Sequence, residues 1–363
     1  MRLLVAGGGT GGHLFPGIAI ADEVVRRGGE VLFVGTSRGI ETRAVPAAGY
    51  KLETLTVSGL KRMGVAGTLR GLFRLPVAMA KSLAILRRFR PDIVVGVGGY
   101  ASGPMVLAAA LLGYPTAIQE QNSVPGITNR ILGKLVSAVF IAFEDAVRFF
   151  PARKVERLGN PVRRAIVTAL ERAPGEAQAG DKLRILVVGG SQGARTVNDL
   201  VMSAAAILAG KALDFALLHQ TGTADLERAQ ERYRSLGLAG RVEVRPFIED
   251  MATAYAQADL VVARAGALTL AELAIAGKPA ILIPLPTAAD DHQSKNAARF
   301  SEAGAALVLD QRTASAEELA MSLAELAEDR PRRARMTAAM RDLARPQAAR
   351  AIVDRLETMA RKR

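Results

Sequence analysis

The sequence predicts an α/β fold of two domains, each a parallel sheet with helices on both faces. The 363 residues are long for one core and suggest domains of about 150 residues each. Short, continuously apolar runs alternate with helical segments, as in sheets buried on both faces. A strand, glycine turn and helix start at Leu3–His13 are repeated at Ile185–Arg195. We therefore expect two doubly wound, Rossmann-like domains.

The apolar runs place the individual strands. We expect them at Leu3–Ala6, Val31–Val34, Ile93–Val97, Thr116–Ile118, Ala138–Ala142, Ile185–Val188, Phe215–His219, Val242–Arg245, Leu260–Ala263, Ala280–Ile283 and Ala306–Leu309. The polar stretch Ala173–Lys182 follows the segment "GNPVRRAI" between the two halves. We place the change of domain near Gly159–Val162, so that the domains span 1–161 and 162–344.

Composition limits the classes of partner. The net charge is +13, and residues 1–160 carry +10 of it, which favours an anionic partner. Aromatic residues make up only 4% of the chain, too few for the base stacking that nucleic-acid binding needs. Cysteine is absent, which excludes disulfides and Cys-ligated metal. The N-terminus enters an apolar strand without a secretory signal, so we expect a cytoplasmic protein.

A basic and apolar segment without any acidic residue lies between Glu53 and Asp92. Its basic residues include Lys61, Arg62, Arg70, Arg74 and Lys81. Its apolar residues include Leu72, Phe73, Leu75 and Met79. This mixture is typical of a surface that rests on anionic lipid headgroups. It is equally typical of basic helices whose apolar residues face the protein core.

Three glycine-rich turns follow predicted strands. Gly7, Gly9 and Gly12 match the dinucleotide pattern G-x-G-x-x-G, but no acidic residue ends the second strand at 34–37, which argues against a nicotinamide or flavin enzyme. The turns Gly98–Pro104 and Gly189–Ala194 repeat the geometry. Glycines admit a ligand close to the backbone, and a helix N-terminus favours anions. The turns therefore indicate more than one diphosphate-bearing ligand.

Polar side chains gather at three further places. Glu120, Gln121 and Asn122 crowd a predicted strand end, where they cap a turn or bind a ligand. Glu272 lies one turn into an apolar helix, where it caps the helix start or binds both hydroxyls of a ribose. A loop at Pro286–Ala297 offers side chains that suit a sugar: Asp290, Asp291, His292, Gln293 and Asn296. Their spacing is too tight for a metal site, so we expect neither metal nor cofactor.

These motifs together resemble the MurG family of peptidoglycan glycosyltransferases. They are "GGGTGGHLFP", "GGYASGP", "EQNSVPGITNR", "GNPVR", "GGSQGA", "PFIEDM", "GALTLAE" and "ADDHQSKNA", in order from about Leu3 to about Ala297. The resemblance implies a two-domain (GT-B) glycosyltransferase whose final helix, about 345–363, packs back on the first domain. That domain would bind the acceptor and the anionic membrane surface, and residues 162–344 would bind UDP-N-acetylglucosamine (UDP-GlcNAc).

The resemblance also implies the reaction and its setting. An inverting transfer of N-acetylglucosamine to undecaprenyl-diphospho-muramoyl-pentapeptide (lipid I) would give lipid II. The enzyme would be peripheral, on the cytoplasmic face of the inner membrane. It would serve peptidoglycan synthesis, and through it cell shape and division, with cell-wall synthesis proteins as partners.

The resemblance carries over to individual positions of this chain. Contacts to UDP-GlcNAc would come from Thr10, Gly11, Gly12, Asn122, Arg163, Ser191, Ile248, Ala267, Leu268, Thr269, Glu272 and Gln293. Within this set, the backbone of Ile248 would read the uracil and Glu272 would hold the ribose. Leu72, Phe73, Leu75 and Met79 would contact the membrane.

The chemistry of an inverting transfer needs a cation and a base. The leaving UDP gains charge on its diphosphate, which Arg163 and the amides of the Ser191 turn would meet. The attacking hydroxyl must lose a proton, for which His13 is the leading candidate and Glu120 the second. The alternative for His13 is a residue that only caps a turn. The alternative for the whole chain is a UDP-GlcNAc 2-epimerase of the same fold.

Overall fold

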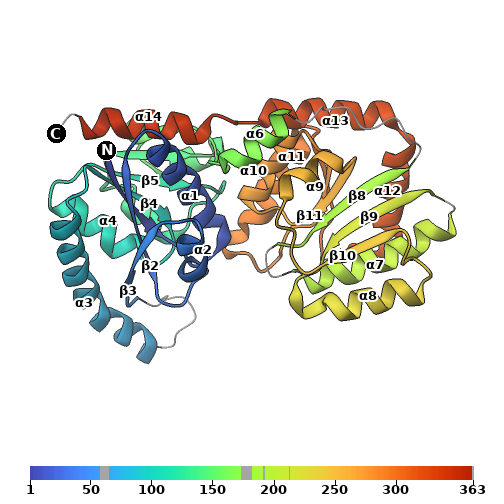
Figure 1. Ribbon diagram of the computed structural model, residues 1–363, viewed down its shortest axis with the longest axis horizontal. Helices are drawn as coiled ribbons and strands as arrows, with labels where there is room; N and C mark the ends of the chain where they lie inside the picture. The colour runs from blue at the N-terminus through green and yellow to red at the C-terminus, as the bar shows by residue number, and fades with distance from the viewer. Residues whose placement is uncertain (58–64, 173–181, 191–192, 212, 362–363) are drawn as a thin grey trace. The chain divides into compact units, whose positions relative to one another are not determined.

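Two parallel sheets carry the fold (Figure 1). The structure is a computed structural model that describes residues 1–57, 65–172, 182–190, 193–211 and 213–361, without the side chains of 65–74, 172 and 289. The chain divides into an N-terminal unit, Met1–Arg164 with Arg345–Arg363, and a C-terminal unit, Ala165–Ala344. The predicted fold class, two doubly wound α/β domains, is confirmed.

The N-terminal sheet has the order β3-β2-β1-β4-β5-β6-β7, and all its pairs are parallel. Its strands are β1 (Arg2–Gly7), β2 (Glu30–Thr36), β3 (Lys51–Leu55), β4 (Ile93–Gly98), β5 (Thr116–Glu120), β6 (Ala138–Ile141) and β7 (Val155–Arg157). Its helices are α1 (Gly11–Arg26), α2 (Glu41–Ala47), α3 (Val65–Phe89), α4 (Ser102–Leu111), α5 (Ile127–Leu132) and α14 (Ala348–Ala360), with 3-10 turns at Glu144–Phe149 and Ala152–Lys154. Residues of α3, α4 and α5 form the core on one face of the sheet, and residues of α1 and α14 form it on the other.

The C-terminal sheet has the order β10-β9-β8-β11-β12-β13 and is also parallel. Its strands are β8 (Leu183–Val188), β9 (Phe215–Gln220), β10 (Val242–Arg245), β11 (Leu260–Ala263), β12 (Ala280–Leu282) and β13 (Ala306–Val308). The helices are α6 (Arg164–Arg172), α7 (Arg195–Gly210), α8 (Leu226–Ser235), α9 (Met251–Gln257), α10 (Ala267–Ala276), α11 (His292–Glu302), α12 (Ala316–Glu328) and α13 (Arg330–Leu343), with 3-10 turns at Thr223–Asp225 and Ala289–Asp291.

Two strands of the N-terminal sheet were not predicted. They are β3, with the sequence KLETL, and β7, with the sequence VER, and they are the two edges of the sheet. Both are mostly half-exposed and carry charged residues, as edge strands do. A search for continuously apolar runs is suited to strands buried on both faces, and it missed these two edges.

The helix α14 belongs to the N-terminal unit although it follows the whole C-terminal unit in the chain. Its residues Ile352, Val353 and Leu356 are fully buried against α1 and the sheet. Arg27, at the end of α1, donates to Asp354 at 2.7 Å and to Glu357 at 3.2 Å. Apolar burial and these ion pairs therefore hold α14 on the first sheet.

Arg27 is positioned by Glu23, which is buried on α1. The Glu23 carboxylate accepts from Arg26 at 2.6 and 2.7 Å and from Arg27 at 2.8 Å. The hydrogen bonds from Arg26 lower the pKa of Glu23 from 4.5 to about 2, against the effect of burial, and Arg27 adds to the lowering. In the folded state the Glu23 carboxylate therefore stays ionised at every pH well above its pKa of about 2.

We predict that Glu23→Gln destabilises the N-terminal unit by about 2 kcal/mol at pH 7, because charge-assisted hydrogen bonds are lost. A carboxylate whose pKa is lowered on folding stabilises above its ordinary pKa and loses that contribution as the pH falls. The difference from the unmodified protein should therefore shrink between pH 4.5 and about 2. Urea unfolding across this range measures it. Glu30→Gln, which breaks an exposed pair with Arg2, is the control, and equal effects of the two variants would contradict the prediction.

Candidate active site

The N-terminal sheet has its switch point between β1 and β4, because the chain leaves these neighbouring strands in opposite directions along the sheet. Ligands of doubly wound folds bind outside the carboxyl ends of the strands at such a point. Here the two glycine-rich turns meet, and Gly8 N donates to Gly98 O at 3.3 Å. A Cβ on Gly99 would lie 2.3 Å from Gly8 O, so this approach is open only to glycine.

His13 lies in the first turn of α1, above the β4 turn. Its Nδ1 is 3.1 Å from Thr10 Oγ1, and its side chain is half-buried. Gly98 has a φ of 97°, and a Cβ there would lie 2.6 Å from His13 Cδ2. The imidazole therefore rests against the backbone of Gly98. Thr10 is the N-cap residue of α1, but its side chain makes no capping hydrogen bond, so it remains directed to His13.

Glu120 ends β5 and is 1% exposed. Its Oε1 accepts from Asn122 N at 2.9 Å, and its Oε2 accepts from Asn129 Nδ2 at 2.8 Å. Burial raises the pKa of the Glu120 carboxyl in spite of these hydrogen bonds. Both oxygens are thus used to fold the segment 120–129, which presents the half-buried Asn122. The carboxylate of Glu120 is therefore buried and engaged in local hydrogen bonds.

Arg163 lies next to the start of α1. Its guanidinium is 5.1 Å from the centre of the Phe15 ring, a distance typical of a cation–π interaction. The Phe15 ring in turn lies 3.1 Å from where a Cβ on Gly11 would be. The N-terminal unit therefore places Thr10, Gly11 and Gly12 beside His13 at the start of α1, and Arg163 against Phe15 of the same helix.

The C-terminal unit repeats the arrangement, with its switch point between β8 and β11. The glycine turn after β8 closes with a hydrogen bond from Gly193 N to Gly190 O at 3.0 Å. Ser191 lies outside the described residues. After β11, residues Ala267, Leu268 and Thr269 form the first turn of α10. The N–H groups of a first helical turn have no partner within the helix, so they are available to an anion.

Glu272 lies in the second turn of α10 and is 8% exposed. The first turn of this helix carries no acidic residue, so the helix-capping interpretation of Glu272 is wrong. Its Oε2 accepts from the hydroxyl of buried Tyr255 at 3.0 Å. Burial raises the pKa of Tyr255, and the charge of Glu272 raises it further, so the phenol stays a donor. This bond fixes the carboxylate and ties α10 to α9.

Gln220, at the end of β9, was not predicted from the sequence. Its Nε2 donates to Gly190 O at 3.0 Å, and its Oε1 accepts from Ile248 N at 2.9 Å. The buried amide therefore links the glycine turn after β8 to the segment after β10. The N–H of Ile248 is used by Gln220, so a ligand that reads this backbone would find the carbonyl. The position of Gln220 at a strand end was the only available signal.

The expected polar loop at Pro286–Ala297 is partly wrong. Gln293 and Asn296 lie on the helix α11, which begins at His292. Gln293 Oε1 accepts from Leu285 N at 3.0 Å, and the fully buried Asn296 donates to Ala265 O at 3.4 Å. These side chains hold the ends of β11 and β12 in place. Buried Arg264, which was not predicted, does the same by donating to the carbonyls that follow β12.

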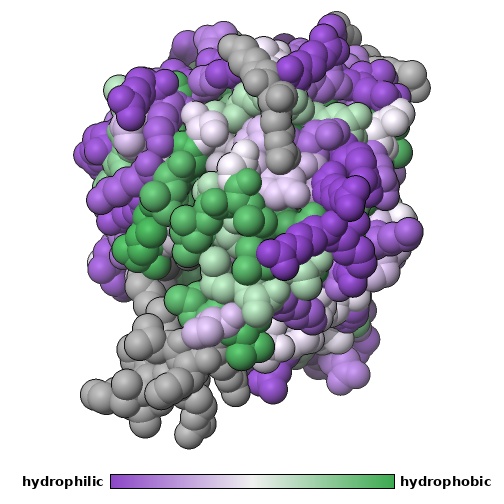
Figure 2. Space-filling view, turned by 90° about the vertical axis from the view of Figure 1, so that its left-hand side faces the viewer, coloured by the Kyte–Doolittle hydropathy of each residue, from purple (hydrophilic) through white to green (hydrophobic). Residues whose placement is uncertain are grey.

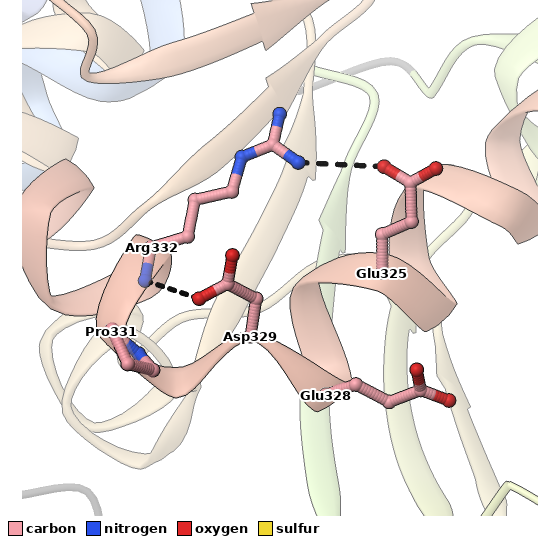
Figure 3. A pocket seen from close by; sticks show the side chains of 5 residues that line it. All are labelled: Glu325, Glu328, Asp329, Pro331 and Arg332. Carbon is pink, nitrogen blue, oxygen red and sulfur yellow. Dashed lines mark hydrogen bonds and ion pairs between the residues drawn. The ribbon is translucent and has the colours of Figure 1, made fainter.

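A surface pocket lies elsewhere, at the turn between α12 and α13 (Figure 3). It is lined by Glu325, Glu328, Asp329, Pro331 and Arg332. Arg332 pairs with Glu325 at 3.4 Å, and its backbone N–H is capped by Asp329 at 2.7 Å. The pocket contains neither a glycine turn nor a predicted site residue, and its polar groups complete a helix–helix connection.

Known proteins share both the sequence and the fold. Residues 3–141 match the glycosyltransferase family 28 N-terminal domain, and residues 184–354 match its C-terminal domain. Proteins of Anaeromyxobacter dehalogenans and Myxococcus xanthus named UDP-N-acetylglucosamine–N-acetylmuramyl-(pentapeptide) pyrophosphoryl-undecaprenol N-acetylglucosamine transferase are each 50% identical to this chain. The alignments cover 100% of this chain and 94% of the first relative, and 98% and 92% for the second.

Solved structures give the same result. The crystal structure of Acinetobacter baumannii MurG has a TM-score of 0.80 and 33% identity, over 98% of this chain and 99% of that one. A UDP-GlcNAc 2-epimerase from Neisseria meningitidis, bound to UDP-GlcNAc, has a TM-score of 0.69 at 16% identity over 99% of this chain and 100% of that one, which shows a shared fold only. Fold and site define a GT-B glycosyltransferase with a glycine turn at each switch point. The chain belongs to glycosyltransferase family 28.

We predict that Gly98→Ala displaces the His13 imidazole, because the new methyl group would overlap its ring. Gly113→Ala is the control, since Gly113 also has a positive φ but open space around it. Gly98→Ala should destabilise the unit by about 1–3 kcal/mol more than the control, which is the usual effect of overpacking. With only three histidines in the chain, imidazole NMR signals report on His13 directly. Equal stability of the two variants and an unmoved signal would show that the ring does not rest on Gly98.

Proposed function

We propose that this glycosyltransferase moves N-acetylglucosamine from UDP-GlcNAc to the 4-hydroxyl of the N-acetylmuramoyl group of lipid I, with inversion, to give lipid II. The observation that carries the proposal is the 50% identity, over essentially the whole chain, to transferases named for this reaction. The two switch-point sites support it, since the reaction uses two diphosphate-bearing substrates. Peptidoglycan synthesis, and with it cell shape and division, would depend on the product.

The donor would bind to the C-terminal unit. Its diphosphate would lie at the turn Gly189–Gly193, which includes Ser191, and at the first turn of α10. Glu272, which Tyr255 holds in place, would accept from the ribose hydroxyls. The carbonyl of Ile248 would accept from uracil N3–H, because Gln220 occupies the N–H of that residue. Gln293 would face the sugar from α11.

The N-terminal unit would neutralise the charge on the leaving diphosphate and accept the proton of the acceptor hydroxyl. Arg163, beside Phe15 of α1, would neutralise the diphosphate as the bond to the sugar breaks. His13 would take the proton of the acceptor hydroxyl, and Thr10 would orient its ring. Glu120 would act indirectly, by folding the turn that presents Asn122. The amides of Gly11 and Gly12, at the start of α1, would contact the donor.

Transfer of labelled N-acetylglucosamine to a short-chain analogue of lipid I tests the proposal. His13→Ala should lower kcat by roughly 10²–10⁴-fold, because a general base acts in the chemical step. It should leave the donor KM within a few-fold and remove the acidic limb of the pH–rate profile. A several-fold decrease with that limb intact would make His13 a turn residue. Conversion of UDP-GlcNAc to its 2-epimer without any acceptor would instead support the epimerase alternative.

The acceptor is a membrane lipid, so we also propose that the enzyme rests on the anionic cytoplasmic face of the membrane, near other cell-wall synthesis proteins. In the part of the chain that the structure describes, no helix is both long and apolar enough to cross a bilayer. Exposed apolar side chains gather instead on the face formed by α3, α4 and α5 (Figure 2). They are Leu75, Val77, Leu111, Leu112, Ile127, Ile131 and Leu135. Exposed Lys81 and Lys134 lie on the same elements or beside them.

The exposure of individual side chains leads us to revise which residues we propose for the lipid contact. Leu75 is exposed as expected, but Met79 packs against the core and is a poor membrane contact. The side chains of Leu72 and Phe73 lie outside the described residues. Leu111 and Ile131 are 72% and 57% exposed and were not predicted, because α4 and α5 carry little charge in sequence. We infer that three helices, and not one segment, form the contact.

We predict that Val77→Asp with Leu111→Asp reduces binding to vesicles, because both side chains are exposed on this face. Val25→Asp with Met321→Asp is the control, since these residues are exposed on other elements. Binding of the unmodified protein should rise with anionic lipid and fall with salt. Co-sedimentation measures all three proteins. If both double variants sediment like the unmodified protein, the membrane contact lies elsewhere.

A further inference from the structure

Glu41 is a buried carboxylate beside the glycine turn that follows β1, and neither the sequence motifs nor the proposed reaction uses it. It is the first residue of α2 and is 0% exposed. Its Oε2 accepts from Gly9 N at 2.8 Å. Its Oε1 accepts from Thr36 N at 2.8 Å and from Thr36 Oγ1 at 2.7 Å. One side chain therefore bridges the end of β2 and the turn after β1.

Glycines make the space that this carboxylate occupies. A Cβ on Gly8 would lie 2.4 Å from Glu41 Cδ, one on Gly35 2.6 Å from its Cγ, and one on Gly39 2.0 Å from its Oε2. Gly35 and Gly39 are not part of the glycine turn, so a ligand at that turn does not explain them. The local sequence is built around the side chain of Glu41.

The carboxylate stays charged in this position. Burial favours the neutral acid, but the hydrogen bonds from Gly9 and Thr36 outweigh it and hold the pKa of Glu41 below its ordinary value. A buried charge is retained only where it is well hydrogen-bonded, since desolvation costs several kcal/mol. Moreover, the bond takes the N–H of Gly9 away from any anion that binds the turn. The hydrogen bond instead fixes the conformation of the glycine turn.

The turn that Glu41 holds is connected directly to His13. Gly9 precedes Thr10, whose carbonyl accepts from His13 N at 3.2 Å and whose hydroxyl lies 3.1 Å from His13 Nδ1. On its other side the turn is held by the bond from Gly8 N to Gly98 O. Gly98 supports the turn and the imidazole ring alike, whereas Glu41 fixes the turn from the side of β2.

We propose that Glu41 is a positioning residue for the transfer reaction: by holding the turn Gly8–Thr10 against β2, it sets the place of the His13 imidazole. This inference rests on the proposed function, in which His13 takes the proton of the acceptor. Glu41 itself touches neither substrate nor reacting atom. Its removal should therefore affect the chemical step and leave the donor site of the C-terminal unit intact.

Glu41→Gln tests this, because the amide has the same size but brings donors towards groups that are themselves donors. We expect kcat to fall about 10²-fold, the usual result when a catalytic group moves by about 1 Å. The affinity for UDP, measured by calorimetry, should stay within two-fold. The NMR signal of His13 should move, while those of His219 and His292 should not. Glu30→Gln, at the other end of β2, is the matched control and should change none of these.

Thr36→Val provides a second, milder variant in case Glu41→Gln does not fold. It removes only the hydroxyl bond to Glu41 and should lower kcat several-fold with the same displaced His13 signal. A folded Glu41→Gln protein with an unmoved His13 signal and the kcat of the control would overturn the proposal. So would an equal loss of UDP affinity, which would mean general disruption. If the unmodified protein transfers no sugar, the proposed function fails, and the NMR signals still decide whether Glu41 positions His13.

Discussion

The contact between two glycine turns, at which Gly8 donates to Gly98, is the constraint on which the N-terminal site depends. A parallel sheet covered by helices on both faces offers a ligand only its carboxyl edge. At the switch point the two turns approach so closely that side chains on Gly98 or Gly99 would collide with His13 or with the opposite backbone. His13 and Thr10 lie beside this contact. The chemistry of the unit thus follows from the absence of side chains at its centre.

In the C-terminal unit, buried polar side chains hold the turns of the site in place. Gln220 links two turns, and next to it His219 bonds to Tyr233 at 2.9 Å and to Asn198 at 3.1 Å. Burial lowers the pKa of His219 to about 3, so its ring is neutral and serves as a fixed link. Asn198 continues the network to Thr221 O and Asp225. A histidine in this chain is therefore not by itself a sign of proton transfer, and the surroundings of each ring decide its role.

The sequence was sufficient for the parts of the fold that depend on burial. Strand β11 appears with the bounds that its apolar run predicts, because all four of its residues are buried. The edge strands β3 and β7 could not be found in this way, since their residues are half-exposed and charged. The glycine turns could be predicted because their spacing is local.

The groups that hold those turns could not be predicted. Glu41 and Gly9 are 32 residues apart, and Gln220 and Ile248 are 28 apart, so nothing in either motif identifies the partner. Each of these bonds also joins a side chain to a backbone group, which every residue type possesses. For the same reason Glu120 could be selected as a polar residue at a strand end, whereas its inward hydrogen bonds became visible only in the structure. The roles of the site residues in binding and transfer remain predictions.

The place of α14 has a consequence for how the protein is made. The face of the N-terminal sheet that receives Ile352, Val353 and Leu356 is completed by residues synthesised after the entire C-terminal unit. During translation the part of that face which α14 covers stays apolar and exposed while about 180 further residues emerge, a time of roughly 10–40 s at ordinary elongation rates. The C-terminal unit is contiguous in sequence and can fold during this interval. Synthesis of the N-terminal unit begins first and is completed last. Its incomplete form, which lacks α14, is therefore the form most exposed to aggregation and to chaperones.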